Sequence, residues 1–84
     1  QLLTNKNALG KIGDVLLYLS EEVFENKTID ASVTRQDIAD LAGISMENAV
    51  RVLSELKNDK IVHISKNGIE IIEMDTLQRI SRAG

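Results

Sequence analysis

The sequence contains no cysteine, no proline and no tryptophan, and its aromatic residues are a single Phe and a single Tyr. Without cysteine there are no disulfides, thiolate metal sites or cysteine nucleophiles, and the composition fits a reducing cytoplasm. A core with so few aromatic side chains must be built from Ile, Leu and Val. No apolar run reaches the length of a membrane span and no signal peptide is visible, so we expect no membrane association.

Length and charge set the class of protein. With 84 residues, 43% hydrophobic and 27% charged, the chain is expected to form one small globular domain. It begins with Gln rather than Met, and we interpret it as a fragment of a larger protein. The net charge of −3 counts against nucleic acid as a partner. The acidic excess lies mainly in residues 1–33, however, whereas acids and bases balance in residues 34–66, and local charge decides whether phosphates are attracted.

Residues 34–58 have the pattern of two helices joined by a tight turn. Thr34 and Asp37 have the spacing of a capping box, Gly43 suits a left-handed helix end, and Ser45 suits the next N-cap. In the first of these helices, Ile38, Leu41 and Ala42 are expected to face the core.

The second helix, residues 45–58, is amphipathic, and its two faces differ in chemistry. One face carries an apolar stripe at helical spacing, made of Ala49, Val52, Leu53 and Leu56. The opposite face is mixed and suits a helix that reads the major groove; it holds Met46, Glu47, Val50, Arg51 and Ser54.

The flanking segments complete a fold. Asn7 is the predicted N-cap of a first helix that runs to about Phe24. Gly10 and Gly13, early in this helix, permit either close packing or flexibility. Its expected inward positions are Leu9, Ile12, Val15, Leu16, Leu19 and Val23. A polar loop follows, and a short strand around residues 31–33 is expected to pair with a later hairpin.

That hairpin is predicted from two β-branched runs, residues 61–65 and 69–72, which flank Lys66-Asn67-Gly68. Asp75 and Gln78 have the spacing of another helix start, for a helix from Thr76 to about Arg82. The predicted fold is therefore α+β: a winged helix-turn-helix with a three-helix core, a β-hairpin wing at residues 61–72 and a short C-terminal helix. It occupies residues 7–84, and residues 1–6 are a hinge or the end of a preceding helix.

The motif T-R-Q-D-I-A, followed by G-I-S-M-E-N-A-V-R-V-L, resembles the C-terminal DNA-binding domain of the Crp/Fnr family of transcription regulators. The resemblance implies a cytoplasmic homodimer that binds an inverted-repeat operator in double-stranded DNA. A sensor domain and a long dimerisation helix would precede this fragment, with residues 1–6 as the hinge. It implies no cofactor in the fragment and leaves the effector of the sensor unknown. RNA polymerase is a candidate partner, because the loop at residues 25–32 occupies the place where activators of the family contact it.

The resemblance also implies residue roles. Glu47 and Arg51 match the base-reading pair of the family, in which Arg donates to guanine and Glu accepts from cytosine. Met46 is a further candidate base-reading residue. It stands where the catabolite-activator branch has Arg, so that branch's additional guanine contact is absent. Val50 is expected to contact a thymine methyl group. The expected phosphate contacts are Thr34, Arg35, Gln36, Ser45, Ser54 and Lys66.

Less specific interpretations stand beside these. Glu47 and Arg51 could form an ordinary salt bridge one helical turn apart. A winged helix that binds a protein instead of DNA is the alternative function, supported by the net charge of −3. An enzyme is not expected, because no catalytic triad, acid pair, phosphate loop or metal cluster is visible. The single histidine, His63, is expected on the wing surface or in packing, rather than in a metal site.

Overall fold

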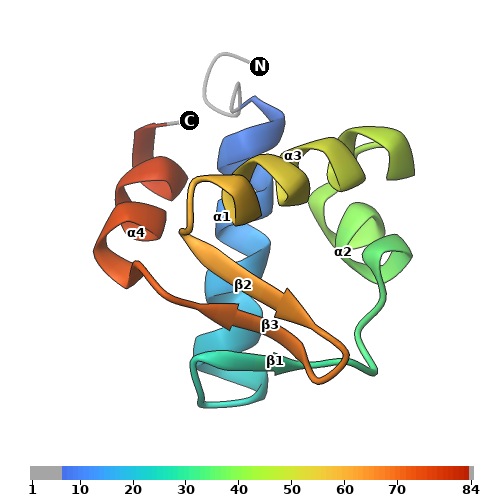
Figure 1. Ribbon diagram of the computed structural model, residues 1–84. Helices are drawn as coiled ribbons and strands as arrows, with labels where there is room; N and C mark the ends of the chain where they lie inside the picture. Colours follow the sequence, from blue (N-terminus) through green and yellow to red (C-terminus); the bar gives the residue numbers. More distant parts are fainter. Residues whose placement is uncertain (1–6, 84) are drawn as a thin grey trace.

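The computed structural model describes residues 7–83, which form a winged helix-turn-helix (Figure 1). In chain order the elements are α1 (Ala8–Tyr18), the π-helical turn η2 (Leu19–Val23), β1 (Thr28–Asp30), α2 (Arg35–Ala42), α3 (Met46–Asn58), β2 (Val62–Ser65), β3 (Gly68–Ile71) and α4 (Met74–Ala83). The predicted fold class is therefore confirmed. The predicted hinge at residues 1–6 lies outside the described part of the chain, as does residue 84.

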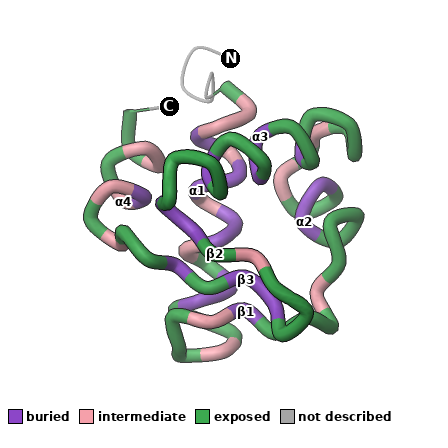
Figure 2. The backbone as a smooth tube through the Cα atoms, viewed as in Figure 1, coloured by how far each residue is buried: buried purple, intermediate pink, exposed green. Residues whose placement is uncertain are grey.

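Helix α1 runs through the middle of the domain, and the other elements pack around it. Helix α4 lies along one side, α2 and α3 lie on the other, and the sheet crosses the lower end in Figure 1. The core between them is aliphatic throughout, as the composition predicts. Its fully buried members, at 0% exposure, include Ile12, Leu16, Ile29, Ile38 and Leu77, one or more from α1, β1, α2 and α4. In Figure 2 each labelled helix and strand has a stretch coloured as buried.

The sheet has three antiparallel strands in the order β1-β3-β2. The hairpin is confirmed, but its turn consists of Lys66 and Asn67 alone, and Gly68 already belongs to β3. In β1, Ile29 pairs with Ile69, and in β2, Ile64 pairs with the same residue from the other side. The central strand β3 is therefore hydrogen-bonded on both edges.

The prediction of a strand at residues 31–33 was wrong, because the strand ends before them. The Asp30 carboxylate accepts a hydrogen bond from the Ser32 backbone N–H at 2.9 Å, and the Val33 N–H donates to the Asp30 carbonyl at 3.0 Å. These bonds turn the chain out of the sheet toward α2. In strand β1 itself, Ile29 is fully buried and lies between half-buried Thr28 and exposed Asp30.

The end of the first helix also differs from prediction. Asn7 caps α1 as expected, with its side-chain oxygen accepting from Gly10 N–H at 2.9 Å. Beyond Tyr18 the helix widens into a π turn, in which Phe24 N–H donates to the Leu19 carbonyl at 2.9 Å. The extra residue in this turn rotates Val23 out of the inward face, and its side chain is 50% exposed instead of buried.

One core prediction and one helix boundary also need correction. Leu41 is 56% exposed, because Ile38 and Ala39 together define the inward face of α2 and Leu41 falls to one side of it. Helix α4 begins at Met74, two residues before the predicted Thr76, so Asp75 lies within its first turn.

Close packing at Gly13 is confirmed. A Cβ atom there would lie 3.4 Å from the Ser81 backbone of α4, and the Ser81 hydroxyl donates to the neighbouring Asp14 carboxylate.

Candidate nucleic-acid interface

The turn between α2 and α3 is built from three local caps, all of which the sequence predicts. Thr34 and Asp37 exchange two hydrogen bonds: the Thr34 N–H donates to the Asp37 carboxylate at 3.0 Å, and the Asp37 N–H donates to the Thr34 hydroxyl at 3.1 Å. Gly43 adopts a left-handed conformation with φ of 70° and ends α2. The Ser45 hydroxyl then accepts from the Asn48 N–H at 3.1 Å and starts α3. These caps fix where each helix begins and ends.

Helix α3 separates its apolar and mixed faces as predicted. The apolar stripe of Ala49, Val52, Leu53 and Leu56 is at most 1% exposed. On the other side Met46 is 40% exposed and Val50 is 36% exposed, two values that are high for apolar side chains. Glu47, Arg51 and Ser54 are exposed on this side as well. Burial of the stripe therefore holds the mixed face of α3 outward.

The remaining predicted contact residues are also on the surface. Thr34, Arg35 and Gln36 open helix α2, Ser45 precedes α3, and Lys66 lies in the wing turn. A hollow of about 230 Å³ separates the start of α2 from the wing. Its lining is Ala31, Val33, Thr34, Arg35, Ile38, Leu53, Ile64, Ser65, Gly68 and Ile69. The start of α2 and the base of the wing turn thus border one concave surface.

The hydrogen-bonding capacity of these residues is only partly used. The Thr34 and Ser45 hydroxyl oxygens accept bonds from helix N–H groups, so each hydroxyl hydrogen remains available to donate. The Gln36 side-chain amide donates to Asp40 at 2.8 Å and would have to share or exchange that bond. Hydroxyl and N–H donors at two helix N-termini form a surface suited to anionic oxygen atoms.

Arg51 has different neighbours from those that the sequence suggests. Its Nη1 donates to Glu55 Oε2 at 3.3 Å, and its Nη2 donates to Asn48 Oδ1 at 3.4 Å. Over residues 7–83, the ion pair of Arg51 is therefore with Glu55 and not with Glu47. Glu55 and Asn48 were missed by sequence reasoning, although their spacing of four and three residues from Arg51 is a usable signal.

The rest of the surface gives weaker indications. Hydrogen bonds from the Ser32 backbone and side chain hold the pKa of Asp30 below its usual value, so this carboxylate stays charged close to Ala31 at the edge of the hollow. His63 is exposed in β2, opposite Glu70 in β3, on the wing surface as predicted.

Over the described range 7–83, there is no cluster of His, Cys, Asp and Glu that could hold a metal ion. Within the same residues, no helix is long and apolar enough to cross a membrane.

Comparison with known proteins gives consistent matches. A family model described as a Crp-like helix-turn-helix domain matches residues 10–80. The transcriptional activatory protein AadR of Rhodopseudomonas palustris (strain ATCC BAA-98 / CGA009) is 28% identical over 57 residues, which cover 68% of this chain and 24% of AadR. The crystal structure of the Thermus thermophilus catabolite activator protein matches with a TM-score of 0.76 at 25% identity.

The structural match covers 96% of this chain and 37% of the catabolite activator protein. The chain thus spans well under half the length of either relative. The family model, in contrast, covers most of the chain and includes the capped turn, α3 and the wing. The chain belongs to the Crp-like helix-turn-helix domain family and is a DNA-binding domain of the transcription-regulator type.

Proposed function

We propose that this domain recognises a specific double-stranded DNA sequence, with α3 in the major groove, and that it acts by binding and not by catalysis. The observation that carries the proposal is the outward face of α3. That face combines Glu47, Arg51 and the exposed apolar Val50 on a helix whose other side is locked into the core. The capped turn before it fixes the angle at which this face is presented.

Base readout is assigned to four side chains of α3. Arg51 donates to a guanine and Glu47 accepts from a cytosine amino group, each contact contributing about 1–3 kcal/mol of discrimination. Val50 packs against a thymine methyl group, which predicts a T·A pair beside the G·C pair. Met46, with no strong donor, reads shape or a methyl group and not a guanine edge. The Arg51–Glu55 pair is exposed on the surface of α3, so it leaves the Arg51 guanidinium accessible to a base edge.

Phosphate contacts are assigned to the two helix starts and the wing. Thr34, Arg35 and Gln36 would bind the backbone at one side of the hollow, and Lys66 would bind it at the other. Ser45 adds the N-terminus of α3, where backbone N–H groups and a free hydroxyl hydrogen favour an anion. Ser54 lies one turn beyond Val50 on the mixed face. These contacts position the helix and are insensitive to sequence.

The assembly around the domain is proposed from its family. Residues 1–6 would be the hinge that follows a dimerisation helix, and a cytoplasmic homodimer would place two copies of α3 on an inverted repeat one helical turn apart. The loop at residues 25–32 is the proposed contact with RNA polymerase. AadR is by name a transcriptional activatory protein, which supports a regulatory role of this kind. An effector-binding sensor would belong to the same regulator.

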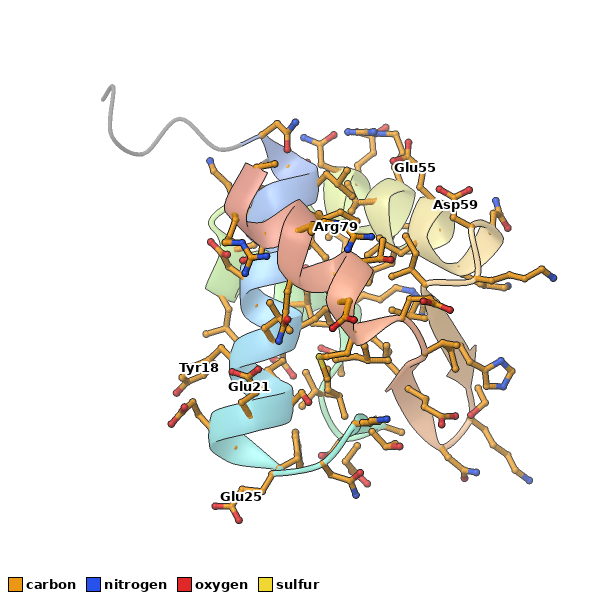
Figure 3. All side chains as sticks on the ribbon, turned by 90° about the vertical axis from the view of Figure 1, so that its left-hand side faces the viewer. Tyr18, Glu21, Glu25, Glu55, Asp59 and Arg79 are labelled. Carbon is orange, nitrogen blue, oxygen red and sulfur yellow. The ribbon has the colours of Figure 1, made fainter. Side chains whose placement is uncertain are left out.

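The proposal is tested by titrating the isotopically labelled domain, at low salt, with a short duplex that carries a TTGA-type half-site. In this half-site a T·A pair lies beside the G·C pair, as the assigned contacts of Val50, Arg51 and Glu47 require. Amide NMR shifts should concentrate at residues 34–36, 45–54 and 65–67, and they should weaken when the G·C pair is swapped. Arg51→Ala should remove this sequence dependence. Arg79→Ala is the matched control, since Arg79 is an exposed arginine on α4 (labelled in Figure 3), a helix to which no DNA contact is assigned.

The opposite result has a clear meaning. Shifts confined to other surfaces, or none with either duplex, would contradict base readout by α3. They would favour the alternative, a winged helix that binds a protein, for which the acidic net charge of −3 is the supporting observation.

A further inference from the structure

Arg51 lies between two glutamates at equal spacing along α3. Glu47 precedes it by one turn and Glu55 follows it by one turn, so either carboxylate is within reach of the guanidinium. In the structure Arg51 pairs with Glu55, at 3.3 Å between Nη1 and Oε2. Its other terminal nitrogen, Nη2, donates to Asn48 Oδ1 at 3.4 Å. All three side chains lie on the surface, with exposures of 56% for Arg51 and 52% for Glu55.

We propose that Glu55, assisted by Asn48, is a positioning residue for DNA recognition. By holding the Arg51 guanidinium, it prevents Arg51 from pairing with Glu47, so that both reading side chains meet DNA without neutralising one another. The inference rests on the proposed function, because it requires Arg51 and Glu47 to read bases.

Ion-pair preferences within a helix explain why Glu55 must compete with Glu47 for Arg51. A Glu four residues before a basic residue is the more favourable order for an ion pair within a helix. Without Glu55, Arg51 would therefore turn toward Glu47. In that pair the Glu47 carboxylate could no longer accept from a cytosine amino group, and the Arg51 N–H donors could no longer bind a guanine. Pairing with Glu55 directs Arg51 toward the C-terminal half of α3 and leaves the Glu47 carboxylate accessible.

Holding Arg51 in this way does not prevent it from reading a base. A guanidinium has five N–H donors, and each terminal nitrogen has two. Glu55 and Asn48 use one hydrogen from each terminal nitrogen. A second hydrogen on each nitrogen, together with Nε–H, remains for a bidentate contact with guanine. Glu55 can thus stay bound to Arg51 in the complex and restrict its rotamers there.

The test compares discrimination and not affinity alone. Removing an acid from the domain should strengthen binding to any duplex, because phosphate attraction does not depend on sequence. The informative quantity is the discrimination ratio, which is the Kd for the duplex with its G·C pair replaced by C·G divided by the Kd for the TTGA-type duplex. Asp59→Asn is the matched control: Asp59 is exposed at the C-terminal end of α3, near Glu55 in Figure 3, and the variant removes the same charge.

Glu55→Gln should lower the discrimination ratio by about two- to fivefold, the range of one exposed ion pair, whereas Asp59→Asn should leave it unchanged. In an Arg51→Ala background, Glu55→Gln should have no effect on the ratio. In the DNA-free domain, Glu55→Gln should also shift the side-chain NMR resonances of Glu47, as Arg51 moves to it. These results together would support the role.

A ratio that Glu55→Gln leaves unchanged or raises would overturn the proposal, and so would an equal effect of Asp59→Asn or an effect that persists without Arg51. Failure of the proposed function looks different. In that case Arg51→Ala itself would leave the ratio unchanged, whatever residue stands at position 55.

Discussion

Gly68 and Gly43 both have positive φ angles, and replacing each by Ala separates conformational strain from steric collision. At Gly43, φ is 70° and no atom from outside the local backbone lies within 4 Å of the place that a Cβ would take, so Ala has open space. Its cost is the left-handed conformation alone, about 1–2 kcal/mol. At Gly68, φ is 131° and a Cβ would lie 1.9 Å from the Ile29 carbonyl oxygen, far inside van der Waals contact.

The magnitude at Gly68 follows from what must move. Strands β1 and β3 cannot keep their register, which pairs Asp30 with Gly68 and Ile29 with Ile69. Separating them exposes Ile29, now 0% exposed, and adds strain at a φ that L-residues avoid. These contributions together are about 3–6 kcal/mol. A domain of this size has a total stability of roughly 4–12 kcal/mol, so Gly68→Ala should be close to unfolding.

Urea denaturation followed by far-ultraviolet circular dichroism measures both variants on one scale. Gly43→Ala should lower the midpoint modestly and keep a two-state transition. Gly68→Ala should lower it several times further or leave the domain largely unfolded without urea. Equal midpoints for the two variants would refute the reasoning, because they would mean that the collision with Ile29 is relieved at no cost.

Other predictions address the cap, the core, the surface and pH. Thr34→Ala removes one side of the capping box and should destabilise the domain by about 1 kcal/mol in urea, and an unchanged midpoint would contradict the capping role. Leu56→Ala should cost about 2–5 kcal/mol because the residue is 1% exposed, whereas Leu41→Ala, at 56% exposure, should change stability by less than about 0.5 kcal/mol. Because its folded pKa is lowered, Asp30 contributes stability above the unfolded value of 3.8 that is lost as pH falls through the folded pKa. Asp30→Asn should therefore reduce the acid sensitivity of urea midpoints, and identical pH profiles would argue against this contribution.

The helix-turn-helix could be predicted from sequence because its signals are local. Thr34, Gly43 and Ser45 each act on backbone groups within a few residues, so their identity is sufficient to place the helix ends. The hairpin is predictable for the same reason, since a short turn connects two β-branched runs. In the candidate interface, the exposure of Glu47 and Arg51 follows directly from the helical period of the apolar stripe.

The errors concern features that depend on distant or competing contacts. Strand β1 was predicted three residues too late in the sequence. Its position is set by pairing with β3 and by the turn at Asp30. The strand preferences of single residues reveal neither of these contacts. The outward rotation of Val23 depends on the π turn of η2. Arg51 has two acids at the same spacing, Glu47 and Glu55. The order preference within a helix favours Glu47, so it does not predict the pair with Glu55 that the structure shows.

The position of β3 between β1 and β2 has a consequence for the thermodynamics of binding. Since β3 is hydrogen-bonded along both edges, the wing is anchored up to Ser65 and from Gly68 onward, and only Lys66 and Asn67 lie beyond the ladder. Ordering a flexible segment on a partner costs conformational entropy, roughly 1–2 kcal/mol for each residue whose backbone is fixed. A wing already held in the sheet avoids most of that loss. DNA association through this edge should therefore show a small entropic penalty from the wing, in spite of its position at the periphery of the domain.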